Sequence, residues 1–322
     1  MERVLDQPVR LRQSETARSL IAAFAVMVTL LLVAPLAIYP VFLMQALCFA
    51  LFACAFNLLI GYVGLISFGH ALFFGWASYL TAHAAKVWAL PPELAIIFGT
   101  AAAALLGLVA GGLAIRRQGI YFAMITLALA QMMYFFALRA KFTGGEDGIQ
   151  GVPRGRLFGL FDLSHELTMY GFVLLVVLAG FLLIYRIINS PFGEVLKAIR
   201  ENEPRAVSLG YRTERYKLVA FVLSATLAGL AGSMKSLVFQ LASLTDVHWT
   251  MSGDVVLMTL LGGLGTVFGP VVGAFLVIAM QNYLAPFGQW VLVIQGTIFV
   301  ACVLAFRRGI VGEIANRMRV SL

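Results

Sequence analysis

Few residues in this chain are of a type and spacing that could carry out chemistry. The four histidines show no metal-binding spacing such as HExxH. They are His70, His83, His165 and His248. The three cysteines lie in apolar stretches without CxxC spacing, which is typical of small apolar filler. They are Cys48, Cys54 and Cys302. The sequence therefore predicts no catalytic residue, no metal site and no cofactor.

The sequence also predicts that the chain itself does not hydrolyse ATP. A phosphate-binding loop needs the pattern GxxxxGK[ST], and no Gly-Lys pair occurs anywhere in the chain. Nearly all carboxylates lie outside the apolar stretches, and Asp254 is the main candidate for an exception. Asp254 either opens a membrane span and reaches outward to water, or faces a cavity as a polar group of a pathway.

The elements that must position these residues are membrane-spanning helices. Of the 322 residues, 61% are hydrophobic and only 12% are charged, whereas soluble proteins carry about 25% charged residues. The apolar residues form long runs, and about 20 such residues span the hydrocarbon core as a helix. Four runs carry no charge at all: Leu20–Tyr39, Val41–Ile60, Leu94–Ile115 and Val291–Phe306. The composition predicts a polytopic membrane protein embedded in a lipid bilayer.

The net charge of +8 is explained by the orientation of the chain in the membrane, so no nucleic-acid partner is needed. Basic residues cluster in four segments, residues 3–18, 116–117, 186–217 and 307–319, and the positive-inside rule places all four in the cytoplasm. We therefore expect a cytoplasmic arm (1–18), a transmembrane domain (19–306) and a cytoplasmic tail (307–322). Both termini would be cytoplasmic, with a cytoplasmic loop at 186–217 and an outer loop at 139–166.

The predicted fold is all-α, a bundle of about 8–10 spans or half-spans. The expected spans are Ser19–Tyr39, Val41–Ile60, a third ending near Lys86, a fourth ending at Arg116, Gly119–Leu138, Leu167–Tyr185, Leu218–Met234 and Gln289–Phe306. With both termini inside, the apolar stretch Asp254–Leu284 must start and end outside, which one helix cannot do. It is either two short spans or a re-entrant hairpin, folded at Gly262–Gly265 and Gly269–Pro270.

Two glycine-broken segments thus stand in the two halves of the chain, one from Gly61 to Gly75 and one from Gly262 to Gly273. Interrupted apolar segments in corresponding positions indicate a transport pathway, whereas the alternative is close helix packing through small residues. Both can hold. The candidate pathway residues are Gly61, Gly64, Ser67, Gly69, His70, Asp254, Gly262, Gly263, Gly265 and Thr266.

The largest cytoplasmic loop has the signals of two short amphipathic helices. Ser190 and Pro191 are typical of a helix start, Pro204 is expected to open a second helix, and Gly210 to end it. Val195, Ala198 and Ile199 recur at helical spacing on one face. The other face carries Glu194, Lys197, Arg200 and Glu201. A long, charged, structured loop of this kind favours docking onto a soluble partner.

Several motifs in order resemble one family across nearly the whole chain from about residue 45. They are Gly61–Ala71 (GYVGLISFGHA), Gly119–Met124 (GIYFAM), Thr143–Gly145 (TGG), Pro191–Gly210, Tyr216–Ser224 (YKLVAFVLS) and Leu261–Thr266 (LGGLGT). Together they resemble the M-type permeases of branched-chain amino acid ABC importers. The resemblance implies a multi-subunit importer in the bacterial inner membrane. Its partners would be a second permease, two ABC ATPase subunits that bind the ATP, and a periplasmic substrate-binding protein.

The resemblance also assigns Gly193–Gly210 as the loop that couples to an ATPase. Its predicted contact residues are Gly193, Glu194, Ala198, Ile199, Arg200, Glu201, Asn202, Glu203, Arg205, Ala206 and Gly210. Many importers carry a Glu-Ala-Ala…Gly pattern here. Ala206 and Gly210 match its spacing, but Pro204 and Arg205 replace Glu and Ala, so the salt bridges of other importer classes are not carried over.

The expected activity is uptake of leucine, isoleucine or valine by alternating access. The family also contains permeases for urea, amides and aromatic or dicarboxylic acids, so these substrates remain alternatives. An ion-coupled secondary carrier would place carboxylates or histidines inside its spans, and a membrane enzyme would need paired reactive groups. The sequence favours neither of these.

Overall fold

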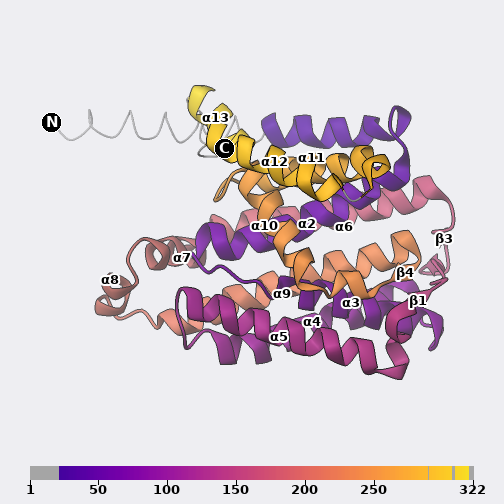
Figure 1. The fold of residues 1–322 in the computed structure, drawn as a ribbon, viewed down its shortest axis with the longest axis horizontal. Coiled ribbons are helices and arrows are strands. Elements are labelled where there is room, and N and C mark those ends of the chain that lie inside the picture. Colours follow the sequence, from indigo (N-terminus) through magenta and orange to yellow (C-terminus); the bar gives the residue numbers. More distant parts are fainter. Residues whose placement is uncertain (1–21, 289, 307–308, 319–322) are drawn as a thin grey trace.

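The computed structural model describes residues 22–288, 290–306 and 309–318. The predicted arm (1–18), the starts of the first and last predicted spans at Ser19 and Gln289, and residues 307–308 and 319–322 of the predicted tail lie outside them. Helices dominate the described residues, and seven are long and apolar enough to cross a membrane. Figure 1 shows them as one bundle of roughly aligned helices.

The helix bounds follow the predicted spans within a few residues. After an apolar helix at Ala22–Leu36 come α2 (Pro40–Tyr62), α3 (His70–Lys86), α4 (Pro92–Ala114), α5 (Ile120–Arg139), α6 (Glu166–Ile188), α9 (Thr213–Phe239), α10 (Trp249–Gly262), α11 (Gly269–Leu284) and α12 (Trp290–Ala305). The prediction of about 8–10 spans or half-spans in an all-α bundle is confirmed. Beyond α12, a short helix, α13 (Gly309–Met318), packs on α10 and α11.

The little strand structure lies at one end of the bundle (Figure 1). β1 (Ile149–Gln150) pairs antiparallel with β4 (Leu241–Ala242), and β2 (Arg156–Leu157) pairs antiparallel with β3 (Phe161–Asp162). Both short sheets involve the predicted outer loop. At the hairpin of β2 and β3, the backbone N–H of Ser164 donates to Asp162, which holds the pKa of that carboxyl below its usual range.

Helices α2 and α9 form the centre of the core. Nearly all of α2 is buried, and α9 packs against α2, α3 and α4. Small residues allow these backbones to approach closely, as is common between membrane helices. A Cβ on Gly232 of α9 would lie 1.9 Å from the carbonyl oxygen of Phe74 in α3. A Cβ on Gly229 would lie 2.2 Å from the Cβ of Ala103 in α4.

The first glycine-rich segment breaks the chain inside the bundle. Residues 63–69 between α2 and α3 are not helical, and α3 has 17 residues. His70 is the first residue of α3. The hydroxyl of Ser224 links it to the carbonyl of Ala55, which lies seven residues before the end of α2. Helix α3 therefore begins at the depth of the α2 interior. The predicted break extended to Gly75, but Gly75 lies within α3, where it packs against Val247.

The second glycine-rich segment joins two short antiparallel helices. Helix α10 has 14 residues and is about 21 Å long, less than the roughly 30 Å of the hydrocarbon core. Gly273 of α11 packs on Met258 of α10, and residues 263–268 form the connecting loop. The prediction that Asp254 opens this apolar stretch is wrong, because α10 begins five residues earlier at Trp249.

Helices α7 (Pro191–Glu201) and α8 (Glu203–Ser208) project from the end of the bundle opposite the strands (Figure 1). As predicted, Ser190 caps α7: its Oγ accepts a hydrogen bond from the N–H of Gly193 at 3.3 Å. The second helix differs from the prediction because Asn202 provides its cap, with Oδ1 accepting from the N–H of Arg205 at 3.0 Å. Pro204 therefore stands in the first turn and does not open the helix.

The buried face of α7 also differs from the predicted one. Leu196 and Ile199 are buried together with Gly193, whereas Ala198 is exposed and Val195 only half-buried. The spacing of apolar residues had suggested a face on Val195, Ala198 and Ile199. The actual face is set by the approach to the bundle, where a Cβ on Gly193 would lie 2.2 Å from the carbonyl oxygen of Ile188.

Candidate functional site

The two glycine breaks meet at the end of the bundle that carries α7. Asn57 of α2 holds the second break with both ends of its side-chain amide. Its Nδ2 donates to the carbonyl oxygen of Thr266 at 2.9 Å, and its Oδ1 accepts from the N–H of Gly265 at 3.0 Å. The hydroxyl of Tyr62 donates to the carbonyl oxygen of Gly265 at 2.9 Å. The freed amides of broken backbone in a membrane are thus satisfied by protein groups.

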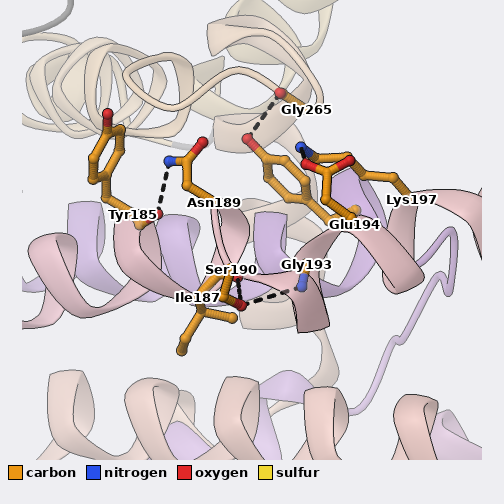
Figure 2. Close-up of polar contacts among 9 residues, drawn as sticks. Tyr185, Ile187, Asn189, Ser190, Gly193, Glu194, Lys197 and Gly265 are labelled. Carbon is orange, nitrogen blue, oxygen red and sulfur yellow. Dashed lines mark hydrogen bonds and ion pairs between the residues drawn. The ribbon is translucent and has the colours of Figure 1, made fainter. Parts of the chain in front are cut away.

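The α7 helix is fastened to the same place. The guanidinium of Arg200 donates to the carbonyl oxygen of Gly61, one residue before the end of α2. Figure 2 shows the first turns of α7, with the Ser190 cap and the ion pair of Glu194 and Lys197, beside the loop that carries Gly265. We call the group formed by Asn57, Gly61, Tyr62, Arg200 and Gly265 the break junction.

A cleft of about 450 Å³ opens at the break junction. Its lining residues are Gly61, Tyr62, Lys197, Arg200, Glu201 and Gly265. The cleft lies between the bundle and α7, so its shape depends on where α7 sits. Any movement of α7 relative to the bundle would change the contacts of both glycine breaks.

The predicted pathway residues separate into two groups and one isolated residue. Gly61, Gly64, Gly262, Gly263, Gly265 and Thr266 lie at or next to the break junction. Ser67, Gly69 and His70 lie deeper, where the chain enters α3. Close packing explains several of these glycines: a Cβ on Gly69 would lie 2.6 Å from the carbonyl oxygen of Thr126. A Cβ on Gly262 would lie 1.8 Å from the carbonyl oxygen of Gly269.

Around this deeper group, three side chains accept hydrogen bonds from backbone N–H groups at or just before the start of α3. The N–H of Phe68 donates to Oγ1 of Thr126 at 3.2 Å, and the N–H of Ala71 donates to Oγ of Ser252 at 2.9 Å. The N–H of Gly69 donates to Oγ of Ser67 at 3.3 Å. These bonds link α3, α5 and α10. The bond to Ser252 gives the N–H of Ala71, in the first turn of α3, the partner that the first amides of a helix lack.

His70 is fully buried, and its neighbours fix its tautomer. The hydroxyl of Ser224 donates to the carbonyl oxygen of Ala55 at 2.5 Å, so Ser224 can only accept from His70 Nε2, which lies 2.8 Å away. The proton of the neutral ring therefore sits on Nε2. Nδ1 is buried without a hydrogen-bond partner among the described residues. The edges of Phe56 and Phe73 surround the ring.

Asp254 lies apart from both groups. It is half-buried on α10, and one of its carboxylate oxygens accepts a hydrogen bond from Nε2 of Gln281 on α11 at 3.4 Å. This contact lies inside the hairpin of α10 and α11. The structure thus places Asp254 one and a half turns into a helix, facing a neighbouring amide.

The predicted ATPase-contact residues also separate by burial. Gly193, Ile199 and Ala206 are buried, and Glu203 is half-buried in an ion pair with Lys217. The exposed members are Glu194, Ala198, Arg200, Glu201, Asn202, Arg205 and Gly210. An apolar patch in and just after α8 was not predicted; it consists of Val207 (54% exposed), Leu209 (72%) and Tyr211 (41%).

Asn57 belongs to the break junction but was not among the residues predicted from the sequence. Its signal was present, since it is a side-chain amide within the charge-free run Val41–Ile60. A buried amide in a membrane helix needs partners for its donors and acceptor, so it marks a point of contact with another polar element. Here the partners are backbone groups more than 200 residues away in the chain.

Comparison with known proteins gives the family. The family model for the permease component of branched-chain amino acid transport systems matches residues 38–303. The chain belongs to this family. The match spans α2 to α12, so it includes both breaks of this permease and α7 with α8.

Two relatives carry the same name, high-affinity branched-chain amino acid transport system permease protein LivM. The one from Escherichia coli (strain K12) is 27% identical over 267 residues, and the one from Salmonella typhimurium (strain LT2) is 26% identical over 272 residues. Each match covers 76% of this permease but only 63% of the relative. The ribose import permease protein RbsC of Bacillus subtilis (strain 168) is 28% identical over 188 residues, covering 56% of this chain and 58% of its own. No solved structure gives a significant match.

Proposed function

We propose that this permease is one of two membrane-spanning subunits of an ABC importer. With a second permease it would form the translocation pathway, while two separate ATPase subunits bind and hydrolyse ATP and a periplasmic binding protein delivers the substrate. The family match and the LivM relatives support this assignment. The expected location is the bacterial inner membrane, with both termini in the cytoplasm.

The projecting pair of helices, α7 and α8, is the observation that carries the proposal. It extends beyond the bundle, it presents the apolar patch of Val207, Leu209 and Tyr211, and it is fastened to the bundle by two polar contacts. A self-sufficient carrier has no need of such an element. A subunit that must receive force from a soluble ATPase needs both an exposed docking surface and a firm connection to its spans.

We propose branched-chain amino acids, namely leucine, isoleucine and valine, as the substrates. The names of the LivM relatives support this choice. Members of the same family that take urea, amides, or aromatic or dicarboxylic acids give the alternative. A relative named for ribose import shows that related permeases serve chemically different solutes. The selecting subunit in this proposal is the binding protein, so the permease needs only a pathway that admits the delivered solute.

Alternating access is the proposed mechanism. Closure of the two ATPases would move α7 and α8, and the two glycine breaks would let α3 and the hairpin of α10 and α11 shift against α2. The breaks support this because their non-helical residues separate α3 from α2 (residues 63–69) and α10 from α11 (residues 263–268).

The test is purification of the tagged permease in mild detergent, followed by mass spectrometry of the bound proteins and transport assays in proteoliposomes. Recovery of a second permease and two ATPases, with leucine uptake that requires ATP and binding protein, supports the proposal. Uptake of another solute class, with the same subunits, would change only the substrate. Recovery of this chain alone, moving solute with an ion gradient and no ATP, would show a secondary carrier and overturn the proposal.

A further inference from the structure

The side chain of Arg200 runs through a groove made by three glycines of the two breaks. It starts on α7, passes Gly64, and ends against Gly61 and Gly265. A Cβ on Gly64 would lie 3.2 Å from Cγ of Arg200, and a Cβ on Gly265 would lie 3.3 Å from Nη1. Both distances are tighter than ordinary contacts, so the groove is fitted to this side chain.

Backbone conformation restricts the same positions. Gly64 has φ +82° and Gly265 has φ +73°, a region that side-chain-bearing residues rarely adopt. Gly61 has no such φ, but a Cβ there would lie 2.3 Å from Oδ1 of Asn57 and 2.9 Å from the backbone nitrogen of Gly265. The glycines therefore serve two purposes: they let the chain turn, and they leave room for an arginine and for the Asn57 amide.

The guanidinium is well suited to joining three elements at once. Arg200 belongs to α7, the carbonyl that it binds belongs to α2, and the glycine beside its Nη1 belongs to the loop between α10 and α11. A guanidinium carries five donors in a planar fork, whereas a lysine offers a single point charge. Hydrogen bonds to charged donors are also stronger than neutral ones.

We infer that Arg200 is a latch: an intramolecular positioning residue that transmits movement of α7 to both glycine breaks, in place of an ATPase contact. This inference rests on the proposed function, since it assumes that ATP hydrolysis on a partner moves α7. Arg200 then acts through the carbonyl of Gly61 and touches no substrate. The other exposed residues of α7 and α8 remain available for docking, while the guanidinium of Arg200 contacts the bundle at Gly61.

The test compares Arg200→Gln and Arg200→Lys with wild type in the complete purified complex, measuring subunit recovery, ATP hydrolysis and substrate uptake separately. A latch predicts full recovery of the ATPases and continued hydrolysis in both variants. Uptake should fall about tenfold or more in Arg200→Gln, which loses the charge-assisted hydrogen bond. Uptake should also fall in Arg200→Lys, which keeps a charged donor but lacks the planar fork. The matched control is Arg215→Gln, because Arg215 is an exposed arginine in the first turn of α9 whose side chain makes no ion pair or hydrogen bond with the described residues.

A second set of variants tests the groove. Gly64→Ala should reduce uptake in the presence of Arg200, and the reduction should be smaller in an Arg200→Ala background, because part of its effect comes from displacing the arginine. Loss of ATPase recovery in Arg200→Gln would identify a docking residue and overturn the inference. Wild-type uptake by Arg200→Gln would also overturn it. If the wild-type complex itself shows no ATP-driven uptake, the proposed function has failed, and the two failures are thereby distinguished.

Discussion

The ammonium of Lys217 lies 2.5 Å from a carboxylate oxygen of Glu203, and this ion pair joins α8 to the first two turns of α9. The Lys217 side chain is 4% exposed and that of Glu203 is 21% exposed. A nearly buried ammonium is costly without a partner. Two polar contacts therefore connect the projecting helices to the bundle, one through Arg200 to α2 and one through Glu203 to α9.

Glu203→Gln is expected to destabilise the bundle by about 1–3 kcal/mol, because it leaves Lys217 unpaired while the site keeps partial contact with water. The thermal unfolding midpoint of the detergent-solubilised protein should fall accordingly. Exchanging the charges, with Glu203→Lys and Lys217→Glu in one protein, should recover part of the loss. An unfolding midpoint equal to that of wild type in Glu203→Gln would mean that the pair contributes nothing to stability.

A second ion pair is buried at both ends. Nζ of Lys235 donates to the two carboxylate oxygens of Asp246 at 2.9 and 2.6 Å, and the N–H of Ser243 donates to the same carboxylate at 3.2 Å. We expect Asp246→Asn to cost about 3–5 kcal/mol because it leaves a buried charge. Combining Asp246→Asn with Lys235→Met should cost less than Asp246→Asn alone, which unfolding of both variants in detergent would measure. A double variant less stable than the single one would contradict this account.

Local signals in the sequence predicted much of the fold. Charge-free apolar runs located the long spans, Ser190 located the start of α7, and the glycine clusters located both breaks. With both termini expected in the cytoplasm, the number of membrane crossings predicted that the stretch before Leu284 folds back on itself. The structure shows two antiparallel helices there. The spans, the cap and the breaks each depend on neighbours within about one helix length, which a sequence pattern records directly.

Contacts between residues far apart in the chain could not be predicted from the sequence. Nothing local to Asn57 identifies the loop of Gly265 as its partner. Arg200 was predicted to contact an ATPase because the family resemblance assigns its loop to coupling, whereas the structure shows its bond to Gly61. The start of α3 inside the bundle was also missed, since the glycine pattern of residues 61–75 does not say where helix resumes. These contacts are decided by how the helices pack, which propensity and periodicity do not contain.

Gly232 tests the close packing of α9 on α3. A Cβ on Gly232 would lie 1.9 Å from a backbone oxygen of Phe74, so Gly232→Ala should force the two helices apart. We expect a loss of stability of about 1–3 kcal/mol, measured as a lower unfolding midpoint. The control is Gly171→Ala on α6, where an added Cβ meets nothing within 4 Å. That variant should be neutral or stabilised by up to about 1 kcal/mol through helix propensity. Equal unfolding midpoints in the two variants would contradict this contact.

Asn57 is expected to hold the second break in place. Asn57→Leu removes the partners of the Gly265 N–H and the Thr266 carbonyl, and each unsatisfied buried group costs about 1–3 kcal/mol. The thermal unfolding midpoint of the detergent-solubilised protein should fall accordingly. The matched control is Asn189→Ala, because Asn189 is exposed and its amide bonds only the carbonyl of Tyr185, one turn earlier, within the part of the chain that the structure describes (Figure 2). An Asn57→Leu variant that unfolds at the same temperature as wild type would show that backbone packing alone holds the loop.

Variants in the apolar patch of α8 test docking to an ATPase independently of folding. Val207 is 54% exposed and Leu209 is 72% exposed, so replacing both with glutamate removes little packing within the bundle. If the patch contacts an ATPase, buried apolar area and shape fit are lost there, and two desolvated carboxylates are added to the interface. We expect an unfolding midpoint close to that of wild type, but loss of ATPase recovery in the purification. Arg215→Glu controls for the added negative charge, because Arg215 lies in the same segment outside the patch. Loss of ATPase recovery in the control as well would assign the effect to net charge, and full recovery in the double variant would place the docking surface elsewhere.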